Sequence, residues 1–159
     1  MQLKDKLIVV TGAGSGIGRS LVKKFIAAGA RTVIAADINA DAARQTAEEL
    51  GCVPMTADVA REEDVLRLID DTERKFGPID LYCNNAGVAM GASEQSPTAE
   101  WQMIWEINVM SHVYSARHLV PRMIARGGGH FLNTASAAGL LNQIGGAAYG
   151  TTKHAAVGF

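Results

Sequence analysis

Five short apolar runs, separated by segments with helical periodicity, constrain the fold of this sequence more than any other feature. The runs are rich in β-branched or aromatic residues and have strand length; they cover Leu7–Val10, Thr32–Ala36, Cys52–Met55, Ile79–Cys83 and His130–Asn133. Helical patterns over Gly16–Ala28, Ala40–Leu50 and Arg61–Phe76 separate the first four. Alternating helices and nearly uniformly apolar strands predict a parallel sheet that is covered on both faces. We therefore expect the α/β class, with one doubly wound domain over residues 1–159.

A longer helical segment, Thr98–Arg126, is apolar over more than half of its circumference. One stripe consists of Trp101, Ile104, Trp105, Val109, Val113, Ala116 and Val120, and a second of Met103, Ile107, Met110 and Tyr114. Because a helix that is apolar all round is buried on more than one side, either the rest of the chain covers both stripes or one stripe faces a partner subunit. Asn108 lies inside this pattern, where a poor helix former needs a reason.

Charge and cysteine usage exclude several classes of function. The 159 residues carry 15 Lys and Arg against 16 Asp and Glu, so we expect no sequence-independent binding to nucleic acid. No run reaches the ~18 apolar residues of a membrane span, and Leu7–Val10 is shorter than the ~7–15-residue core of a signal peptide. Cys52 and Cys83 lack CxxC spacing, and the four histidines lack the spacing of metal ligands. We expect a cytoplasmic protein with reduced thiols, no metal and no membrane partner.

A glycine-rich loop follows the first predicted strand and opens the first predicted helix. It reads Thr11-Gly12-Ala13-Gly14-Ser15-Gly16-Ile17-Gly18, so the pattern is GxxxGxG and not the strict GxGxxG. Glycines permit a tight turn and a close approach to a pyrophosphate, whose charge the free amides and the dipole of a helix N-terminus favour. The loop therefore predicts dinucleotide binding; a plain strand-to-helix turn is the alternative. The cofactor contacts expected here are Gly12, Ser15, Gly16, Ile17 and Gly18.

Asp37 comes at the end of the second predicted strand, 19 residues after the last glycine of that loop. A carboxylate in this place accepts hydrogen bonds from the adenosine ribose and repels a 2′-phosphate. Ser15 and Ile38 add no positive charge beside it, and Arg31 begins the strand and so belongs to the opposite end of the sheet. The pattern favours NAD over NADP. The alternative for Asp37 is a turn or cap residue, although Asn39 could equally cap the next helix.

Three further motifs follow in a fixed order. Asn84-Asn85-Ala86-Gly87 comes after the fourth predicted strand, Ser136 comes after the fifth, and Tyr149-Gly150-Thr151-Thr152-Lys153 begins thirteen residues beyond Ser136. The spacing of Tyr149 and Lys153 places a phenol and an ammonium on one face of a helix. Together with the glycine loop, this ordered set resembles the classical short-chain dehydrogenase/reductase family, from about Lys6 to the last residue.

The resemblance implies catalytic roles for Ser136, Tyr149 and Lys153. Tyr149 would act as the general acid/base. A free phenol has a pKa near ~10, and a cation one turn away stabilises its phenolate; Lys153 would supply that cation and also bind the nicotinamide ribose. Ser136 would donate a hydrogen bond to the substrate oxygen. The alternatives are a loop serine for Ser136 and a half-buried helix pair for Tyr149 and Lys153.

Asn108 matches the asparagine that, in this family, kinks its helix and holds a water in a proton relay to the lysine. A freed backbone carbonyl would explain its position in mid-helix. An interhelical hydrogen bond is the alternative.

Two more segments match cofactor contacts of the family. Asp58 and Val59 match its adenine contacts, although Asp58 could instead cap the helix that follows. Asn85, Ala86 and Gly87 match the stretch that shapes the cofactor cleft, with a plain turn as the alternative.

The resemblance further implies a Rossmann-type sheet and an NAD-dependent oxidoreductase that interconverts a secondary alcohol and a ketone. The expected substrate is a partly apolar small molecule near Val88, Met90, Leu140, Leu141 and Gln143. The second stripe of Thr98–Arg126 motivates a homo-oligomer, a dimer or tetramer in the full-length form, because family members commonly pair through this helix and the Tyr149 helix.

Classical members of the family continue with a further crossover, two more strands and a substrate-covering segment. We therefore expect this chain to be incomplete after the Tyr149–Lys153 motif, with C-terminal strands missing and the fifth strand as an open edge. The alternative function is that of an NAD-binding module, or a truncated fragment, without turnover.

Overall fold

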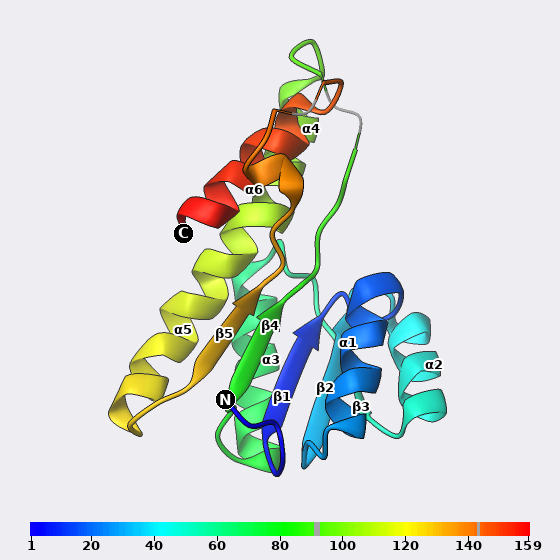
Figure 1. Cartoon of the computed structure of the whole chain (residues 1–159), viewed down its shortest axis with the longest axis vertical. Helices are drawn as coiled ribbons and strands as arrows, with labels where there is room; N and C mark the ends of the chain where they lie inside the picture. The colour runs from blue at the N-terminus through cyan, green and yellow to red at the C-terminus, as the bar shows by residue number, and fades with distance from the viewer. Residues whose placement is uncertain (91–92, 143) are drawn as a thin grey trace.

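Five parallel strands form the sheet in a computed structural model that describes residues 1–90, 93–142 and 144–159 (Figure 1). The strand order is β3-β2-β1-β4-β5, and every neighbouring pair is parallel. The strands are β1 (Leu7–Thr11), β2 (Thr32–Asp37), β3 (Val53–Thr56), β4 (Leu81–Asn84) and β5 (His130–Asn133). The predicted α/β class and doubly wound parallel sheet are therefore confirmed, with β3 and β5 at the two edges.

Helices cover both faces of this sheet, so alternate residues of the central strand β1 are buried on opposite sides. Leu7 and Val9 of β1 belong to a core shared with α3 (Glu62–Phe76) and α5 (Ser111–Ala125). Ile8 and Val10 belong to a second core shared with α1 (Gly16–Ala27). The helix α2 (Ala40–Leu50) packs beside α1 and against β2 and β3. All five residues of β1 are buried, as the uniform apolar run predicts.

The long segment predicted as one helix is interrupted in the middle. It consists of α4 (Thr98–Trp105), a π-helical turn η1 (Glu106–Met110) and α5. The amide of Ser111 donates to the carbonyl of Glu106, five residues earlier. Asn108 lies at the centre of this turn, so the irregularity predicted at Asn108 is present.

The two apolar stripes of this segment are not separated as the sequence suggested. Ile107 and Tyr114 of the second stripe pack against the core under α3 and α5, whereas Met103 of that stripe is exposed, as are Trp105 and Val120 of the first. The chain itself thus covers part of the stripe that motivated an oligomer. Sequence periodicity shows that two faces are apolar, but it does not show which neighbour covers each face.

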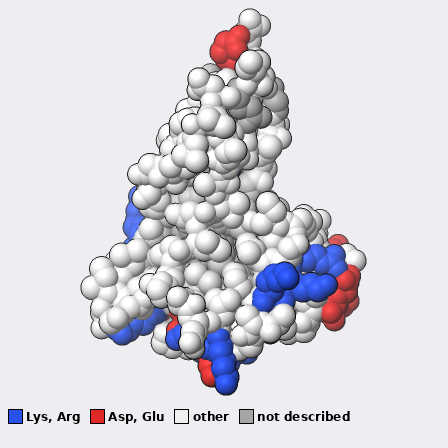
Figure 2. All heavy atoms as spheres, viewed as in Figure 1, with Lys and Arg blue, Asp and Glu red and all other residues white. Residues whose placement is uncertain are grey.

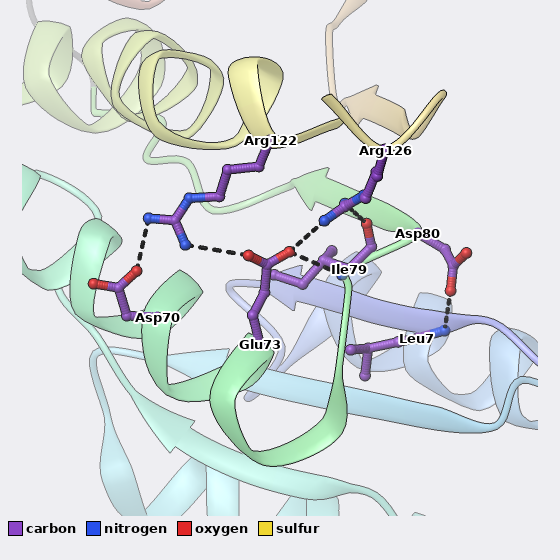
Figure 3. Close-up of polar contacts among 7 residues, drawn as sticks. All are labelled: Leu7, Asp70, Glu73, Ile79, Asp80, Arg122 and Arg126. Carbon is purple, nitrogen blue, oxygen red and sulfur yellow. Dashed lines mark hydrogen bonds and ion pairs between the residues drawn. The ribbon is translucent and has the colours of Figure 1, made fainter. Parts of the chain in front are cut away.

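A cluster of charged side chains fixes the turn between α3 and β4 to the end of α5 (Figure 3). Glu73 accepts hydrogen bonds from Arg126 at 2.6 Å, from Arg122 at 3.1 Å and from the amide of Ile79 at 3.1 Å. Arg126 also donates to the carbonyl of Ile79, and Arg122 pairs with Asp70 at 2.7 Å. Since the backbone of Ile79 is bonded to α3 in this way, β4 begins at Leu81 and not at the predicted Ile79.

The chain closes with a short 3₁₀ turn, η2 (Ala137–Gly139), and with α6 (Ala147–Gly158), which contacts α4, η1 and η2. These elements form the upper part of the molecule, above the carboxyl ends of the strands (Figure 1). On the face drawn in Figure 2, charged side chains gather at the lower end, and apart from one acidic tip the upper part carries almost none. In the described part of the chain, no helix has the length and apolarity needed to cross a membrane.

Candidate active site

A cleft of about 520 Å³ opens at the carboxyl ends of the strands. Such a place is where open parallel sheets bind ligands. Among the residues of the cleft wall are all the predicted site residues except Asn108: Gly12, Ser15, Gly16, Ile17, Gly18, Asp37, Asp58, Val59, Asn85, Ala86, Gly87, Ser136, Tyr149 and Lys153. The fold thus brings together segments that are up to 141 residues apart in the sequence (Gly12 to Lys153).

The glycine loop leaves no room for side chains at three of its positions. A Cβ on Gly14 would lie 2.7 Å from the Cβ of Ala42 and 2.9 Å from a carboxylate oxygen of Asp37. Gly12 has a φ of +65°, and a Cβ there would lie 2.8 Å from the Cα of Ala86. A Cβ on Gly18 would overlap the carbonyl oxygen of Gly12. The loop can therefore close tightly over the start of α1 only because these three residues are glycine.

The start of α1 keeps the features of an anion site. Ser15 has extended backbone angles at the N-cap, but its side chain makes no capping hydrogen bond, and the first turn contains no acidic residue. The helix dipole and the first amides of α1 are therefore not neutralised by a carboxylate of that turn. A phosphate group would meet favourable charge in this position.

Asp37 holds the glycine loop as well as lining the cleft. One carboxylate oxygen accepts from the amide of Gly14 at 2.8 Å, and the other accepts from the amide of Asn39 at 2.9 Å. Asn39 caps α2, since its side chain accepts from the amides of Asp41 and Ala42. The sequence had offered Asn39 as a possible cap of this helix. Each carboxylate oxygen has a second lone pair, so Asp37 can accept further hydrogen bonds from a ligand.

Asn85 links the ends of three strands beneath the cleft. Its side chain donates to the carbonyl of Thr11 at 3.0 Å and accepts from the hydroxyl of Thr134 at 3.1 Å. The Thr11 hydroxyl donates to the carbonyl of Cys83 and accepts from the amides of Asn85 and Ala86, each at 3.1 Å. These bonds fix the ends of β1, β4 and β5 relative to one another, which makes the floor of the cleft rigid.

Lys153 and Tyr149 project from the first turns of α6. The Lys153 ammonium is buried and donates to the carbonyl of Thr134 at 2.8 Å, and it lies 5.8 Å from the centroid of the Tyr149 ring. Burial lowers the pKa of Lys153 from its ordinary value. An ammonium has three donors, so two remain for groups in the cleft or around it.

Asn108 lies behind the cleft wall and is fully buried. Its amide nitrogen donates to the carbonyl of Val88 at 2.9 Å and to the hydroxyl of Thr152 at 3.1 Å, while its oxygen accepts from the amide of Val88 at 2.9 Å. The interhelical hydrogen bond weighed as the alternative is thus present, together with the helix irregularity. Through Thr152, this side chain fixes the turn of α6 that carries Lys153.

Ser136 and Asp58 each order a short turn at the rim. The Ser136 oxygen accepts from the amide of Ala138 at 3.2 Å, which leaves its hydroxyl hydrogen free to be donated. Asp58 accepts from the amide of Ala60 at 3.0 Å. The N-cap of α3 is Arg61, so Asp58 forms a local turn and does not itself cap the helix.

Of the residues predicted near the substrate, one lines the cleft and three are exposed to solvent. Val88 lines the cleft, whereas Met90, Leu140 and Leu141 are exposed above it, the two leucines by 72% and 68%. Gln143 lies outside the described residues.

Several residues of the cleft were not predicted from the sequence. Thr134 bonds both Lys153 and Asn85, and Ala57, Ala89 and Ala135 also line the cleft. Thr134 and Ala57 directly follow the ends of β5 and β3. The rule that ligands bind at the carboxyl ends of parallel strands would have selected both positions.

The sequence is related to curated dehydrogenases. A family model described as short chain dehydrogenase matches residues 6–159. The chain is 39% identical over 164 residues to the 1-deoxy-11-beta-hydroxypentalenate dehydrogenase of Streptomyces exfoliatus, a match that covers 98% of this chain and 59% of that protein. It is 33% identical over 161 residues to the 7alpha-hydroxysteroid dehydrogenase of Escherichia coli, covering 98% and 63%. The chain therefore spans less than two thirds of the length of these relatives.

Solved structures agree with this relationship. A short-chain dehydrogenase/reductase from Burkholderia phymatum in complex with NAD matches with a TM-score of 0.94 at 33% identity, over 99% of this chain and 58% of that one. A 7 alpha-hydroxysteroid dehydrogenase complexed with NADH and 7-oxo glycochenodeoxycholic acid matches with a TM-score of 0.90 at 34% identity, over 98% and 62%.

Proposed function

The chain belongs to the short-chain dehydrogenase family, and from that premise we propose that it is an NAD-dependent oxidoreductase interconverting a secondary alcohol and a ketone. The observation that carries the proposal is the position of Tyr149, Lys153 and Ser136 in the same cleft as the glycine loop. A hydrogen-bond donor, a proton-transfer group and a dinucleotide cradle are the parts that such a reaction needs in one place.

In the proposed mechanism, Tyr149 moves the hydroxyl proton of the substrate. Lys153 stabilises the phenolate form through its charge, 5.8 Å from the ring centroid. The Thr134 carbonyl holds this ammonium at 2.8 Å, so its position is fixed before substrate enters. Ser136 has a free hydroxyl hydrogen and donates it to the substrate oxygen, where negative charge develops. When bound, the nicotinamide supplies or accepts the hydride.

Asp37 supports NAD over NADP as the cofactor of this cleft. Gly12, Gly16 and Gly18 leave space for a pyrophosphate against α1, and Asp37 faces the same cleft. The carboxylate would accept from ribose hydroxyls and repel a 2′-phosphate. The two related structures, with NAD and NADH, support the same choice.

Asp37→Asn tests this choice, because it keeps an oxygen that can accept from the Gly14 amide and removes the charge. We expect the ratio of the Kd for NADP to the Kd for NAD to fall about tenfold, the effect of roughly 1.4 kcal/mol. Calorimetric titration of both cofactors gives this ratio. An unchanged ratio would show that Asp37 serves the loop alone.

For the substrate we propose an uncharged, partly apolar alcohol. Leu140, Leu141 and Met90 expose apolar side chains, and Ile144, three residues after Leu141, is fully exposed. Figure 2 shows that the upper part of the molecule carries almost no charged groups on the face drawn. An apolar substrate body would cover these side chains, whereas a charged one would meet few counter-ions on that face.

We also propose a homo-oligomer in the cytoplasm. Exposed Trp105 and Val120 on the long helical segment give apolar area for a second copy. Cys52 and Cys83 are free thiols, and burial raises the pKa of Cys83 to about 12, as suits an inert core residue in a reducing compartment. Light scattering that showed a monomer at micromolar concentration would contradict the oligomer.

The central test combines NADH binding with turnover. We expect calorimetry to show binding of NADH, and a panel of alicyclic ketones to give oxidation of NADH at 340 nm. Binding without turnover across the panel would favour an NAD-binding module instead. Absence of binding would contradict both functions.

A further inference from the structure

His112 is a buried titratable side chain that the proposed mechanism does not use. It lies on α5, one turn after Asn108, and is 1% exposed. Its Nδ1 is the only buried side-chain nitrogen or oxygen without a hydrogen-bond partner among the residues that the structure describes. A buried polar atom of this kind costs free energy unless a partner satisfies it.

The polar neighbours of His112 on the same helix already have partners. Asn108 is bonded to Val88 and to Thr152. The Ser115 hydroxyl, one turn after His112, lies 2.9 Å from the side-chain oxygen of Asn84 and 3.0 Å from the backbone carbonyl of His112, either of which can accept its hydrogen. The unused Nδ1 is therefore a specific feature of His112 and not a general property of this helix face.

The charge that acts on His112 is that of Lys153, from α6. Burial and, to a lesser degree, this charge lower the pKa of His112 to about 4. The imidazole is therefore neutral at pH 7, with one nitrogen free to accept. The carboxylates that α3 presents to α5 act elsewhere, since Glu62 is bonded to Arg117 and His118, and Glu73 belongs to the cluster of Figure 3.

Lys153 has donors to spare on the same side of the cleft wall. The Lys153 ammonium has three N–H groups, and among the described residues only the carbonyl of Thr134 accepts a hydrogen bond from it. A Cβ added to Gly87 would lie 3.2 Å from the Asn108 oxygen and 3.7 Å from the Lys153 Nζ, so both atoms face Gly87. His112 follows Asn108 by one turn, which brings the unsatisfied acceptor and the unused donors to the same buried region.

We propose that His112 is a positioning residue for Lys153: a buried water accepts a hydrogen bond from the ammonium and donates one to Nδ1. The direction follows from the chemistry, because an ammonium only donates and a water between the two must then donate to an acceptor. Nε2 therefore carries the imidazole proton. The pair acts as a second anchor for Lys153 beside the Thr134 carbonyl. Its effect on catalysis rests on the proposed function, whereas the anchor itself does not.

The first test uses the full chain without cofactor or substrate. The pKa of the Lys153 ammonium is followed by NMR of its Cε and Nζ in the wild type, His112→Leu and His112→Asn. His112→Leu removes the acceptor from a charged group, so the pKa of Lys153 falls by about 0.5 to 1 pH unit. His112→Asn places an amide near the position of Nδ1 and keeps most of the wild-type value. Ser115→Ala is the control, because it removes a buried hydroxyl one turn away that contacts Asn84 and the backbone carbonyl of His112 but not the imidazole; it leaves the titration of Lys153 unchanged.

A lysine titration that is the same in His112→Leu and the wild type would overturn the proposal. So would a shift in Ser115→Ala as large as that in His112→Leu. If His112→Leu does not fold, the ¹⁵N shifts of His112 in the wild type decide: the proton on Nε2 supports the proposal, and the proton on Nδ1 contradicts it.

The second test measures kcat/KM against pH for alcohol oxidation. In His112→Leu the acid limb moves to higher pH by about 0.5 pH units, because a less firmly held ammonium stabilises the phenolate less. In His112→Asn it returns toward the wild type, and in Ser115→Ala it does not move. If His112→Leu lowers the pKa of Lys153 but the wild type has no turnover, the anchor is supported and the proposed function is contradicted. Failure of the anchor and failure of the proposed function therefore give different results.

Discussion

At the amino-terminal ends of the strands, charged side chains are bonded to one another, whereas at the carboxyl ends polar groups retain unused donors and acceptors. The cluster around Glu73 joins α3, α5 and the turn before β4, and each of its charges has a partner (Figure 3). At the other end, Ser136 keeps a free hydroxyl hydrogen and Lys153 keeps two free donors among the described contacts. The first region can hold the fold, and the second can hold a ligand.

The parallel topology explains this division. All five strands point the same way, so the loops that lead into α1, α2 and α3 emerge at one edge together with the positive ends of these helix dipoles. The opposite edge receives the helix C-termini, where Arg122 of α5 and Arg126 just after its end meet carboxylates of α3. Changes at the two ends should therefore separate activity from stability.

The largest expected effect is that of Tyr149→Phe at the ligand end. Loss of the phenolic hydroxyl removes the proton-transfer group, so kcat should fall about 10³-fold. The Tyr149 hydroxyl has no hydrogen bond to another described residue, so the midpoint of urea unfolding should stay within error of the wild type. Turnover of NADH with the best ketone of the panel measures the first quantity. Turnover at the wild-type rate would contradict the catalytic role of Tyr149.

Gly18→Ala should have the next largest effect, again at the ligand end. The added methyl group overlaps the carbonyl of Gly12 and would force the loop open, at a cost of about 1–3 kcal/mol for overpacking. We expect NADH to bind about 10- to 100-fold more weakly in calorimetry. Gly158→Ala is the matched control, since a Cβ at that helical glycine meets no atom within 4 Å. Equal binding by both variants would mean that the loop tolerates a side chain.

Much of this division could be predicted from the sequence, because it depends on local patterns. The uniform apolar runs predicted the sheet, and the position of Asp37 and the glycine loop at strand ends predicted one cleft. The partners of Glu73 could not be predicted in this way. Arg122 and Arg126 are about fifty residues away from it, and only the packing of α5 on α3 brings them together.

The same reason explains the other differences. Ile79 belongs by composition to the fourth strand, but its bond to Glu73 places it in the turn. The second apolar stripe suggested a partner surface because periodicity cannot show that Ile107 and Tyr114 pack against the core under α3 and α5. Asn108 could be identified from the sequence because asparagine is a poor helix former. Nothing in the sequence distinguishes His112, whose unpaired Nδ1 is visible only in the structure.

Glu73→Gln tests the cluster at the amino-terminal ends of the strands, where we expect a moderate loss of stability. Burial would raise the pKa of Glu73, but hydrogen bonds from Arg126, the Ile79 amide and Arg122 outweigh it and hold the pKa below its ordinary value. At pH 7 we expect a loss of about 1–2 kcal/mol in the free energy of unfolding, allowing for partial exposure, with unchanged binding of NADH.

The pH dependence of this loss has a definite sign. A carboxyl whose pKa is depressed by folding contributes stability above its unfolded pKa of ~4.3, and loses it as pH falls through the folded value. The difference between wild type and Glu73→Gln should therefore be full at pH 7 and smaller at pH 4 and below. Urea unfolding at both pH values measures it. A difference that grew toward low pH would contradict the role assigned to Glu73.

The smallest effect is expected for Arg117→Ala, on the outer edge of the same helix pair. Arg117 bonds both carboxylate oxygens of Glu62, at 2.6 and 2.7 Å, but more than half of its side chain is exposed. Water and salt screen such a pair, and His118 remains at 2.8 Å from the same carboxylate. The Tm should fall by less than about 2 °C at low salt, and this difference should vanish in 1 M NaCl. A drop as large as that of Glu73→Gln would show that the whole α3–α5 contact, and not the Glu73 cluster alone, fixes the amino-terminal end of the sheet.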